Sequence, residues 1–528
     1  MIKKYLLSER FPTRYSPIIK SIKNILPFIL LFVFTILFRI NFINLPYERD
    51  EGEYAYTAYF TRQGVVPYRD IFDQKPPLIF LIFYFSEILN PGGTWGPRVL
   101  SLISAYAVAV LLFLTGKELF DTRTGLVSMW LFIAMLTIPE MTPFAANTEI
   151  FMLPFVMGCF FIFVCYKNSN KKLPWYLFGA FSSIAVMFKP ICIPLLLYIF
   201  ITWIYNYATN NHNFKSLLIN ILLTAFGIVT VISPIFLYLV KNNALKSFFD
   251  TVIIYNLSYF QEFHNNGLKR FVYIIPIIIA TFPLIFLSTF ILILSKRHNS
   301  WYFAGILFFL FLPIYNSPSL HYYLIIIPFI ALFASAGFNY LLIRYTINHN
   351  ATRAYLTFLF ILSAILMNLN SIFSSNEELL QQTYHNNQFF NSVLFAKMLT
   401  KFTKTEDEIL MLGNEPQVLY YSKRKSASRF FYMYPMFIPT AKTKIYQDEY
   451  INDLTTKVPK FIVFTPYIYP DNRGNNEAIV FLKKTDAIIH EKYDAVGGCK
   501  AEEGCGWTED INKNNMDQFS FILFRKKT

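Results

Sequence analysis

Long apolar runs, separated by short polar or basic segments, dominate the first 373 positions of the chain. A helix that crosses a membrane needs roughly 20 consecutive apolar residues. A further apolar run, 77–89, is short for a span and is predicted to lie at the membrane interface or to re-enter the membrane. We therefore expect an α-helical polytopic membrane protein with about 11 transmembrane helices and an upper limit of about 13. The predicted spans are 24–43, 97–116, 124–140, 150–166, 173–188, 190–207, 216–240, 271–295, 300–315, 321–343 and 353–373.

The basic residues between these runs predict the orientation of the bundle. Loops that face the cytoplasm carry an excess of Lys and Arg. With the segment 1–23 as a cytoplasmic tail, most of the basic residues in short loops fall on the inner side. If 77–89 crossed the membrane, every later loop would change sides and the basic loops would face outward. The predicted inner loops are 117–123, 167–172, 208–215, 296–299 and 344–352, and the predicted outer ones are 44–96, 141–149, 189, 241–270 and 316–320.

The last segment, 374–528, has a different pattern and is predicted to be a soluble α/β domain on the outer side. It alternates short apolar strands with polar turns. Two cysteines in it, Cys499 and Cys505, are six residues apart among glycines, and a local disulfide is expected in an oxidising compartment. Together with 24–373 as the membrane domain, this gives three parts to the chain. The expected strands are Ile409–Leu412, Phe461–Thr465, Ile479–Leu482 and Phe519–Phe524.

Composition and charge support a membrane protein and exclude several function classes. The chain is 55% hydrophobic and 15% charged, whereas soluble proteins carry about 25% charged residues. The net charge of +14 follows from the basic inner loops, and no basic stripe interleaved with aromatic residues predicts a nucleic-acid partner. The sequence contains no GxxxxGK[ST], HExxH or GxSxG motif, so it gives no support for nucleotide chemistry or serine hydrolysis.

An acidic cluster follows the first predicted span. Six carboxylates lie between Glu48 and Asp73, in a chain that otherwise has few charges. Ionisable groups at membrane depth are costly and usually functional. A buried carboxylate there can accept a proton from a substrate hydroxyl. The alternative is a solvated loop, but acidic residues contribute little to membrane orientation, so we favour Asp50 and Glu51 as catalytic candidates.

Four further charged residues are predicted on the same outer face. Lys75, held before two prolines, suits a phosphate, although it could also be an interfacial lysine. Glu149 could share acid–base work or ion binding with Asp50, or could only favour a helix N-terminus beside a capping Asn147. Lys189 could bind phosphate or mark a turn. His321 could bind a metal or phosphate, or could be structural.

The ordered set of motifs resembles one known family, the GT-C glycosyltransferases that depend on polyprenyl phosphate. It is most similar to the clan of protein O-mannosyltransferases and aminoarabinose transferases, over residues 24–345, and the late segment GNEPQVLYYSKRKSASRF resembles the start of their soluble tail. The motifs that carry the resemblance are DEGEYAY (50–56), PYRDIFDQKPPL (67–78), Arg98, NTEIF (147–151), FKP (188–190) and HYYLIIIP (321–328).

The resemblance implies inverting transfer of a sugar from a polyprenyl-phosphate donor to a lipid, glycan or protein acceptor, on the outer face of the cytoplasmic membrane. It assigns the role of base or acceptor-positioning group to Asp50, with Glu51 beside it, and a second acidic role to Glu149. Lys75 would hold the donor phosphate, assisted by Lys189 and Arg69. A divalent cation is a candidate cofactor, with Asp50, Glu149 and His321 as ligands. In the aminoarabinose transferases a glutamate precedes the lysine, whereas this chain has Gln74, which removes one metal ligand.

Two other functions compete with glycosyl transfer. A transporter or flippase of lipid-linked sugars would also bury charges and bind phosphate. It would favour repeated halves and helices broken at the midplane, and the sequence shows no such repeat. A receptor-like or assembly protein would act through its outer tail, and the carboxylates of the first outer loop would then be dispensable.

Overall fold

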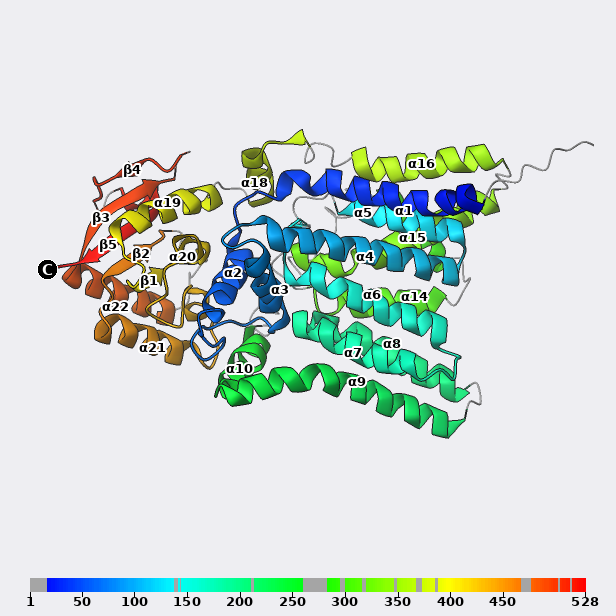
Figure 1. Cartoon of the computed structure of the whole chain (residues 1–528), viewed down its shortest axis with the longest axis horizontal. Coiled ribbons are helices and arrows are strands. Elements are labelled where there is room, and N and C mark those ends of the chain that lie inside the picture. Colours follow the sequence, from blue (N-terminus) through cyan, green and yellow to red (C-terminus); the bar gives the residue numbers. More distant parts are fainter. Residues whose placement is uncertain are drawn as a thin grey trace, which may run out of the picture.

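The chain forms a bundle of apolar helices with an α/β domain at one end, as seen in a computed structural model (Figure 1). The structure describes residues 17–136, 141–142, 144–209, 213–259, 283–294, 300–315, 320–345, 349–366, 373–384, 388–466, 476–501, 504–512 and 515–528. The α/β domain lies at the left of Figure 1, and the helices of the bundle run side by side away from it.

Each of the eleven predicted spans contains a helix in the described residues. Parts of three spans, 137–140, 271–282 with 295, and 367–372, lie outside those residues. By length and apolar character, six helices of the described chain are able to cross a membrane, and five apolar helices are shorter. The bundle helices are α1 (Pro17–Arg39), α4 (Trp95–Leu119), α5 (Thr122–Met135), α6 (Thr148–Tyr166), α7 (Leu173–Phe188), α8 (Ile193–Thr209), α9 (Phe214–Lys241), α13 (Pro283–Leu294), α14 (Ser300–Phe311), α15 (Ile327–Arg344) and α16 (Asn350–Leu366).

Small residues allow close packing between these helices, as is usual in membrane bundles. In the α7–α9 pair, a Cβ added to Gly179 would lie 2.0 Å from the carbonyl oxygen of Thr224. A Cβ added to Gly227 would lie 2.1 Å from the carbonyl oxygen of Tyr176. Only glycine permits this backbone approach. Apolar side chains on the outer side of α9 stay exposed, among them Leu222, Phe226 and Leu237, as expected for a helix facing lipid.

Several short elements lie between the bundle and the α/β domain (Figure 1). The first outer loop contains α2 (Arg49–Thr61) and α3 (Leu78–Leu89). The α3 helix corresponds to the predicted interfacial segment, and it packs against both α2 and α4. After α9 come α10 (Leu245–Phe248) and a π-helix over Phe249–Tyr255. A π-helix is uncommon and often marks a functional site. Before the C-terminal domain, the described chain also contains short 3₁₀ helices at Ile40–Phe42, Pro190–Cys192 and Leu320–Ile325.

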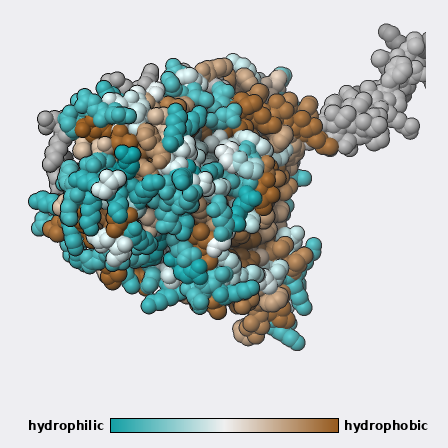
Figure 2. All heavy atoms as spheres, turned by 60° about the vertical axis from the view of Figure 1, so that its left-hand side comes forward, coloured by the Kyte–Doolittle hydropathy of each residue, from teal (hydrophilic) through white to brown (hydrophobic). Residues whose placement is uncertain are grey.

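The C-terminal region contains a five-stranded sheet with the strand order β1-β2-β5-β3-β4. The β1–β2 pair is parallel, and the other neighbours are antiparallel. Figure 2 shows hydrophilic residues over much of this end of the molecule. The strands are β1 (Ile409–Leu412), β2 (Phe461–Phe464), β3 (Tyr493–Lys500), β4 (Trp507–Thr508) and β5 (Phe519–Lys526), and the helices are α18 (Asn376–Tyr384), α19 (Gln388–Phe402), α20 (Gln417–Ser422), α21 (Thr443–Thr456) and α22 (Asn476–Lys492), with 3₁₀ turns at Tyr434–Met436 and Met516–Gln518.

One predicted strand is wrong. The segment Ile479–Leu482 lies inside helix α22. The buried residues of this helix are Ala478, Phe481, Thr485 and Ile489, a spacing of three or four that belongs to one helix face. Four consecutive apolar residues look the same in a buried strand and in a helix. Strands β3 and β4 were not predicted, and a disulfide joins Cys499 in β3 to Cys505.

Candidate active site

The first turn of α2 fixes the backbone around Asp50. Glu48 caps the helix, and its carboxylate accepts hydrogen bonds from the backbone N–H groups of Asp50 (3.0 Å) and Glu51 (3.1 Å). The carboxylate of Glu51 accepts from the N–H of Glu48 in return (3.4 Å). This reciprocal arrangement is a capping box. It gives the acidic cluster of the sequence a rigid helix start.

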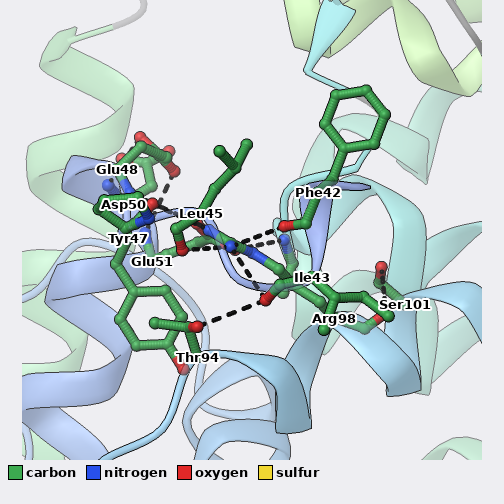
Figure 3. Close-up of polar contacts among 12 residues, drawn as sticks. Phe42, Ile43, Leu45, Tyr47, Glu48, Asp50, Glu51, Thr94, Arg98 and Ser101 are labelled. Atoms are coloured by element: carbon green, nitrogen blue, oxygen red, sulfur yellow. Dashed lines mark hydrogen bonds and ion pairs between the residues drawn. The ribbon is translucent and has the colours of Figure 1, made fainter. Parts of the chain in front are cut away.

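Glu51 is held in a buried ion pair with Arg98 of α4 (Figure 3). The Arg98 guanidinium donates to both carboxylate oxygens, at 3.0 and 2.6 Å. It also donates to the carbonyl oxygens of Phe42 (2.9 Å) and Pro46 (3.0 Å), and Glu51 accepts a further bond from the N–H of Ala146 (2.9 Å). Both side chains are at most 3% exposed. All these contacts are internal, so they fit a structural role for Glu51 better than the predicted catalytic one.

Asp50 has a more open environment than Glu51. Its carboxylate lies 3.3 Å from the Lys75 ammonium, and its side chain is 26% exposed. Burial raises the pKa of Asp50, but the positive charges of Lys75 and Lys189 outweigh this effect and hold the pKa below its ordinary value. Asp50 is therefore ionised at neutral pH, and part of its carboxylate is accessible to a substrate.

The backbone of the segment 73–75 is fixed by three side chains, one of them from the segment itself. Asp73 accepts a hydrogen bond from the N–H of Lys75 (2.8 Å), and the Tyr68 hydroxyl donates to the Lys75 carbonyl (2.9 Å). Asn256, just after the π-helix, donates to the carbonyl of Gln74 (2.8 Å). The Lys75 ammonium also lies 5.6 Å from the ring centre of Tyr54, close enough for a cation–π contact. The lysine is thus directed at Asp50 before any ligand binds.

A second ion pair joins Glu149 at the start of α6 to Lys189 after α7. The Lys189 ammonium also lies 3.4 Å from the ring centre of Tyr322, and His321 Nε2 lies 3.8 Å from the same Glu149 carboxylate. Asn147 occupies the N-cap position of α6, but its side chain makes no capping hydrogen bond. Asn147 therefore lies at the start of the helix, as predicted, but its side chain does not cap it. Glu149 pairs with a lysine.

The two ion pairs belong to one electrostatic group. The charge of Lys189 acts on Asp50 as well as on Glu149, and the charges of Lys189 and Lys75 both act on His321. Burial lowers the pKa of His321, as do Lys189 and Lys75, and these effects exceed the opposing charges of Glu149 and Asp50. His321 is therefore neutral at neutral pH. Two carboxylates and two ammonium groups remain, and their charges compensate each other.

Comparisons with known proteins agree with this architecture. Residues 74–238 match the family described as dolichyl-phosphate-mannose-protein mannosyltransferase. The structure of ArnT from Cupriavidus metallidurans bound to undecaprenyl phosphate superposes with a TM-score of 0.61 at 12% identity, covering 96% of this chain and 98% of that one. Archaeal oligosaccharyltransferase AglB from Archaeoglobus fulgidus, in complex with an inhibitory peptide and a dolichol-phosphate, gives 0.51 at 11% identity, with 94% and 75% covered. No curated protein matches the chain in sequence.

The chain has the GT-C fold. The resemblance stated from the motifs is confirmed, and so is the predicted fold class of a helical membrane protein with a small C-terminal sheet. The family match also confirms the enzyme class, glycosyltransferase. Its matched segment contains Lys75, Arg98, Glu149 and Lys189, whereas Asp50 and His321 lie outside it.

Arg69, which was predicted to assist at the donor phosphate, lies apart from the two ion pairs Asp50–Lys75 and Glu149–Lys189. The Arg69 side chain is 42% exposed and pairs with Asp70 at 2.8 Å. Its guanidinium also donates to the carbonyl of Asn242 (2.9 Å). Because these bonds hold Arg69 at the surface, the structure brings together Lys75 and Lys189 but not Arg69.

The predicted metal ligands Asp50, Glu149 and His321 lie close to the two lysines of the site. Among the described residues, no three His, Cys, Asp or Glu side chains are grouped so that they could hold a metal ion. Asp50 and Glu149 each face a lysine ammonium, which has no free lone pair for a metal. In this arrangement each carboxylate is paired with a lysine. Ligation of a divalent ion by Asp50, Glu149 and His321 stays a prediction from the sequence, and we assign no chemical step to a metal.

Sequence reasoning missed a pair of buried acids beside Lys75. In the described part of the chain, Glu53 Oε2 and Asp73 Oδ2 have no hydrogen-bond partner. Burial raises the pKa of Asp73 to about 7. It raises the pKa of Glu53 well above its ordinary value, with a further contribution from the negative charges of Asp73 and Asp50. The density of carboxylates in 48–73 was a signal for this pair, but their burial was not visible in the sequence.

Proposed function

We propose that this glycosyltransferase moves a sugar from a polyprenyl-phosphate donor to a lipid, glycan or protein acceptor, with inversion, at the outer face of the cytoplasmic membrane. The observation that carries the proposal is the Asp50–Lys75 pair, partly open to solvent, next to a second buried lysine where the apolar helices end. A lipid-linked donor requires a cationic site at that level. The presence of undecaprenyl phosphate in the structure of ArnT and of dolichol-phosphate in that of AglB supports this donor class.

In the proposed mechanism, the donor phosphate competes with Asp50 for Lys75. A lysine beside the phosphate stabilises the charge that develops as the bond to the sugar breaks. When Lys75 turns to the phosphate, Asp50 loses the charge that lowers its pKa and becomes a better base. The acceptor hydroxyl then attacks the anomeric carbon from the face opposite the phosphate, its proton passes to Asp50, and polyprenyl phosphate leaves. A single displacement of this kind inverts the configuration.

Glu149 and His321 would act through Lys189 in this scheme. The Glu149 carboxylate is 1% exposed and is bonded to the lysine ammonium and to the Thr148 hydroxyl. It holds the cation in a buried position that no isolated lysine could occupy at low cost. The match to a glycosyltransferase family favours sugar transfer over the alternative, a flippase of lipid-linked sugars.

The test is a transfer assay with purified protein and a panel of undecaprenyl-phosphate sugars, comparing the wild type with Asp50→Asn. Loss of a general base costs about 10²–10⁴-fold in rate, so we expect at least a hundredfold loss with an unchanged folded yield. The matched control is Asp448→Asn, which makes the same chemical change at an exposed surface ion pair. Equal transfer by Asp50→Asn would remove Asp50 from its role, and no transfer by the wild type from any polyprenyl-phosphate donor would contradict the proposed function.

A further inference from the structure

The first turn of α2 is also bound by the C-terminal domain. Arg49, which directly precedes Asp50, donates from Nε and Nη2 to Glu415 Oε1 at 2.8 and 2.6 Å. Glu415 is separated from Arg49 by 366 residues in the chain and is 1% exposed. Two short bonds to one oxygen of a buried carboxylate make this a strong charge-assisted contact.

Glu415 is held in place by its own domain. Its second oxygen, Oε2, accepts a hydrogen bond from the Gln417 side chain (2.6 Å). The neighbouring Asn414 accepts from the N–H of Met433 (3.0 Å), which joins the segment before α20 to the chain after it. The carboxylate therefore has a fixed position that is set by the C-terminal domain, and Arg49 must come to it.

A backbone contact at Gly52 brings the two elements together. A Cβ added to Gly52 would lie 2.7–2.9 Å from the Cβ, N and Cα atoms of Gln417, so glycine is the residue that permits this approach. Glycine inside a helix is unfavourable relative to alanine, and the close packing gives a physical reason for it here. Two hydrogen bonds flank the contact, from the Tyr47 N–H to the Tyr421 hydroxyl (2.6 Å) and from the Ser426 N–H to the Tyr56 hydroxyl (2.8 Å).

We propose that Glu415 is a positioning residue for Asp50, so that the C-terminal domain sets the geometry of the catalytic helix. This inference rests on the proposed function. Asp50 lies between Arg49, held by Glu415, and Glu51, held by Arg98 of the membrane bundle. Its carboxylate is thus aligned by both parts of the molecule. A misplacement of about 1 Å at a reacting group can cost about a hundredfold in rate, so loss of one anchor should be visible in turnover.

The test compares Glu415→Gln with the wild type in the full-length protein. The matched control is Glu449→Gln, because Glu449 also accepts two short bonds from an arginine of the same domain, Arg429, and is not bonded to α2. We expect kcat to fall about tenfold for Glu415→Gln, with KM for the donor within about twofold. The control should retain the turnover of the wild type. Backbone amide hydrogen exchange over 48–54 should become faster in Glu415→Gln only.

A double mutant separates positioning from general destabilisation. If Glu415 acts through Asp50, its substitution should have no further effect in the Asp50→Asn background. An unchanged kcat for Glu415→Gln, an equal tenfold loss in both backgrounds, or unchanged exchange over 48–54 would each overturn the inference. If the wild type transfers no sugar, the proposed function fails, and the exchange result alone still decides whether Glu415 holds the first turn of α2.

Discussion

Two neighbouring carboxylates of α2, Glu51 and Asp50, lie in different environments. Glu51 accepts three hydrogen bonds from Arg98 and Ala146 and is 1% exposed. Asp50 has one ion-pair partner, Lys75, and 26% of its side chain is exposed. A carboxylate whose bonds are all internal can hold a helix, but it has no capacity left for a substrate.

The difference in burial indicates that the Glu51–Arg98 pair and the Asp50–Lys75 pair have different roles. A buried ion pair with many bonds is costly to break and serves as a structural anchor. A pair that is partly open to water can exchange its partner for a ligand. The following three predictions test this division, beginning with the largest effect.

Removal of one partner of the buried Arg98–Glu51 pair should destabilise the protein. Arg98→Gln leaves the Glu51 carboxylate buried without its counter-charge, which costs about 3–5 kcal/mol. We expect a clearly lower unfolding temperature in detergent and a lower yield of folded protein. The matched control is Lys444→Gln at the exposed Lys444–Asp448 pair, where a surface ion pair contributes about 1 kcal/mol or less. An unfolding temperature for Arg98→Gln equal to that of the control would refute the anchor.

Removal of Lys75 from the partly exposed Asp50–Lys75 pair should lower the activity but not the stability of the protein. In Lys75→Gln the charge that we propose for stabilising the donor phosphate is lost, and removal of one such stabilising group costs about 10²–10³-fold in kcat. Asp50 keeps access to water, so we expect only a small change in unfolding temperature. Transfer rates at varied donor concentration would measure the loss, with Lys444→Gln again as the control. Full activity in Lys75→Gln would mean that this lysine is not the phosphate ligand.

The smallest effect concerns Asp73, which supports the backbone of Lys75. Burial raises its pKa to about 7, compared with about 4 in an unfolded chain. Its contribution to stability is therefore complete below about pH 4 and is lost as the pH rises through about 7. We expect Asp73→Asn to reduce the fall in unfolding temperature between pH 5 and pH 8 by roughly 2–4 °C.

The control for this prediction is Asp70→Asn. The hydrogen bond from Arg69 lowers the pKa of Asp70 despite partial burial, so Asp70 is ionised at both pH values and its loss should not alter their difference. An unchanged pH dependence in Asp73→Asn would show that Asp73 does not titrate in this range.

The parts of the fold that follow from apolar patterning could be predicted from sequence. Eleven hydrophobic runs each contain a helix in the described residues, because backbone groups in lipid must be bonded within one segment. The charged residues Asp50, Lys75, Glu149, Lys189 and His321 could be selected for a related reason. A charge at the border of an apolar run is costly, and the structure brings these five together.

What could not be predicted depends on contacts between distant residues. The structural role of Glu51 could not be predicted, because its partner Arg98 lies 47 residues away in the chain. Arg69 was predicted to assist Lys75 at the donor phosphate, but its partner Asp70 keeps it at the surface. Ile479–Leu482 was predicted as a strand because four apolar residues are too few to distinguish a helical from an extended period.

The close approach of Gly52 to Gln417 has a consequence for engineering. Chimeric enzymes that exchange the C-terminal domain would be joined near residue 373, between the bundle and that domain. Such a junction would combine an α2 from one parent with a 413–426 segment from the other, and their backbones are complementary at atomic distance. A functional recombinant must therefore inherit residues 47–56 and 413–426 from the same parent, although more than 350 positions of sequence separate them.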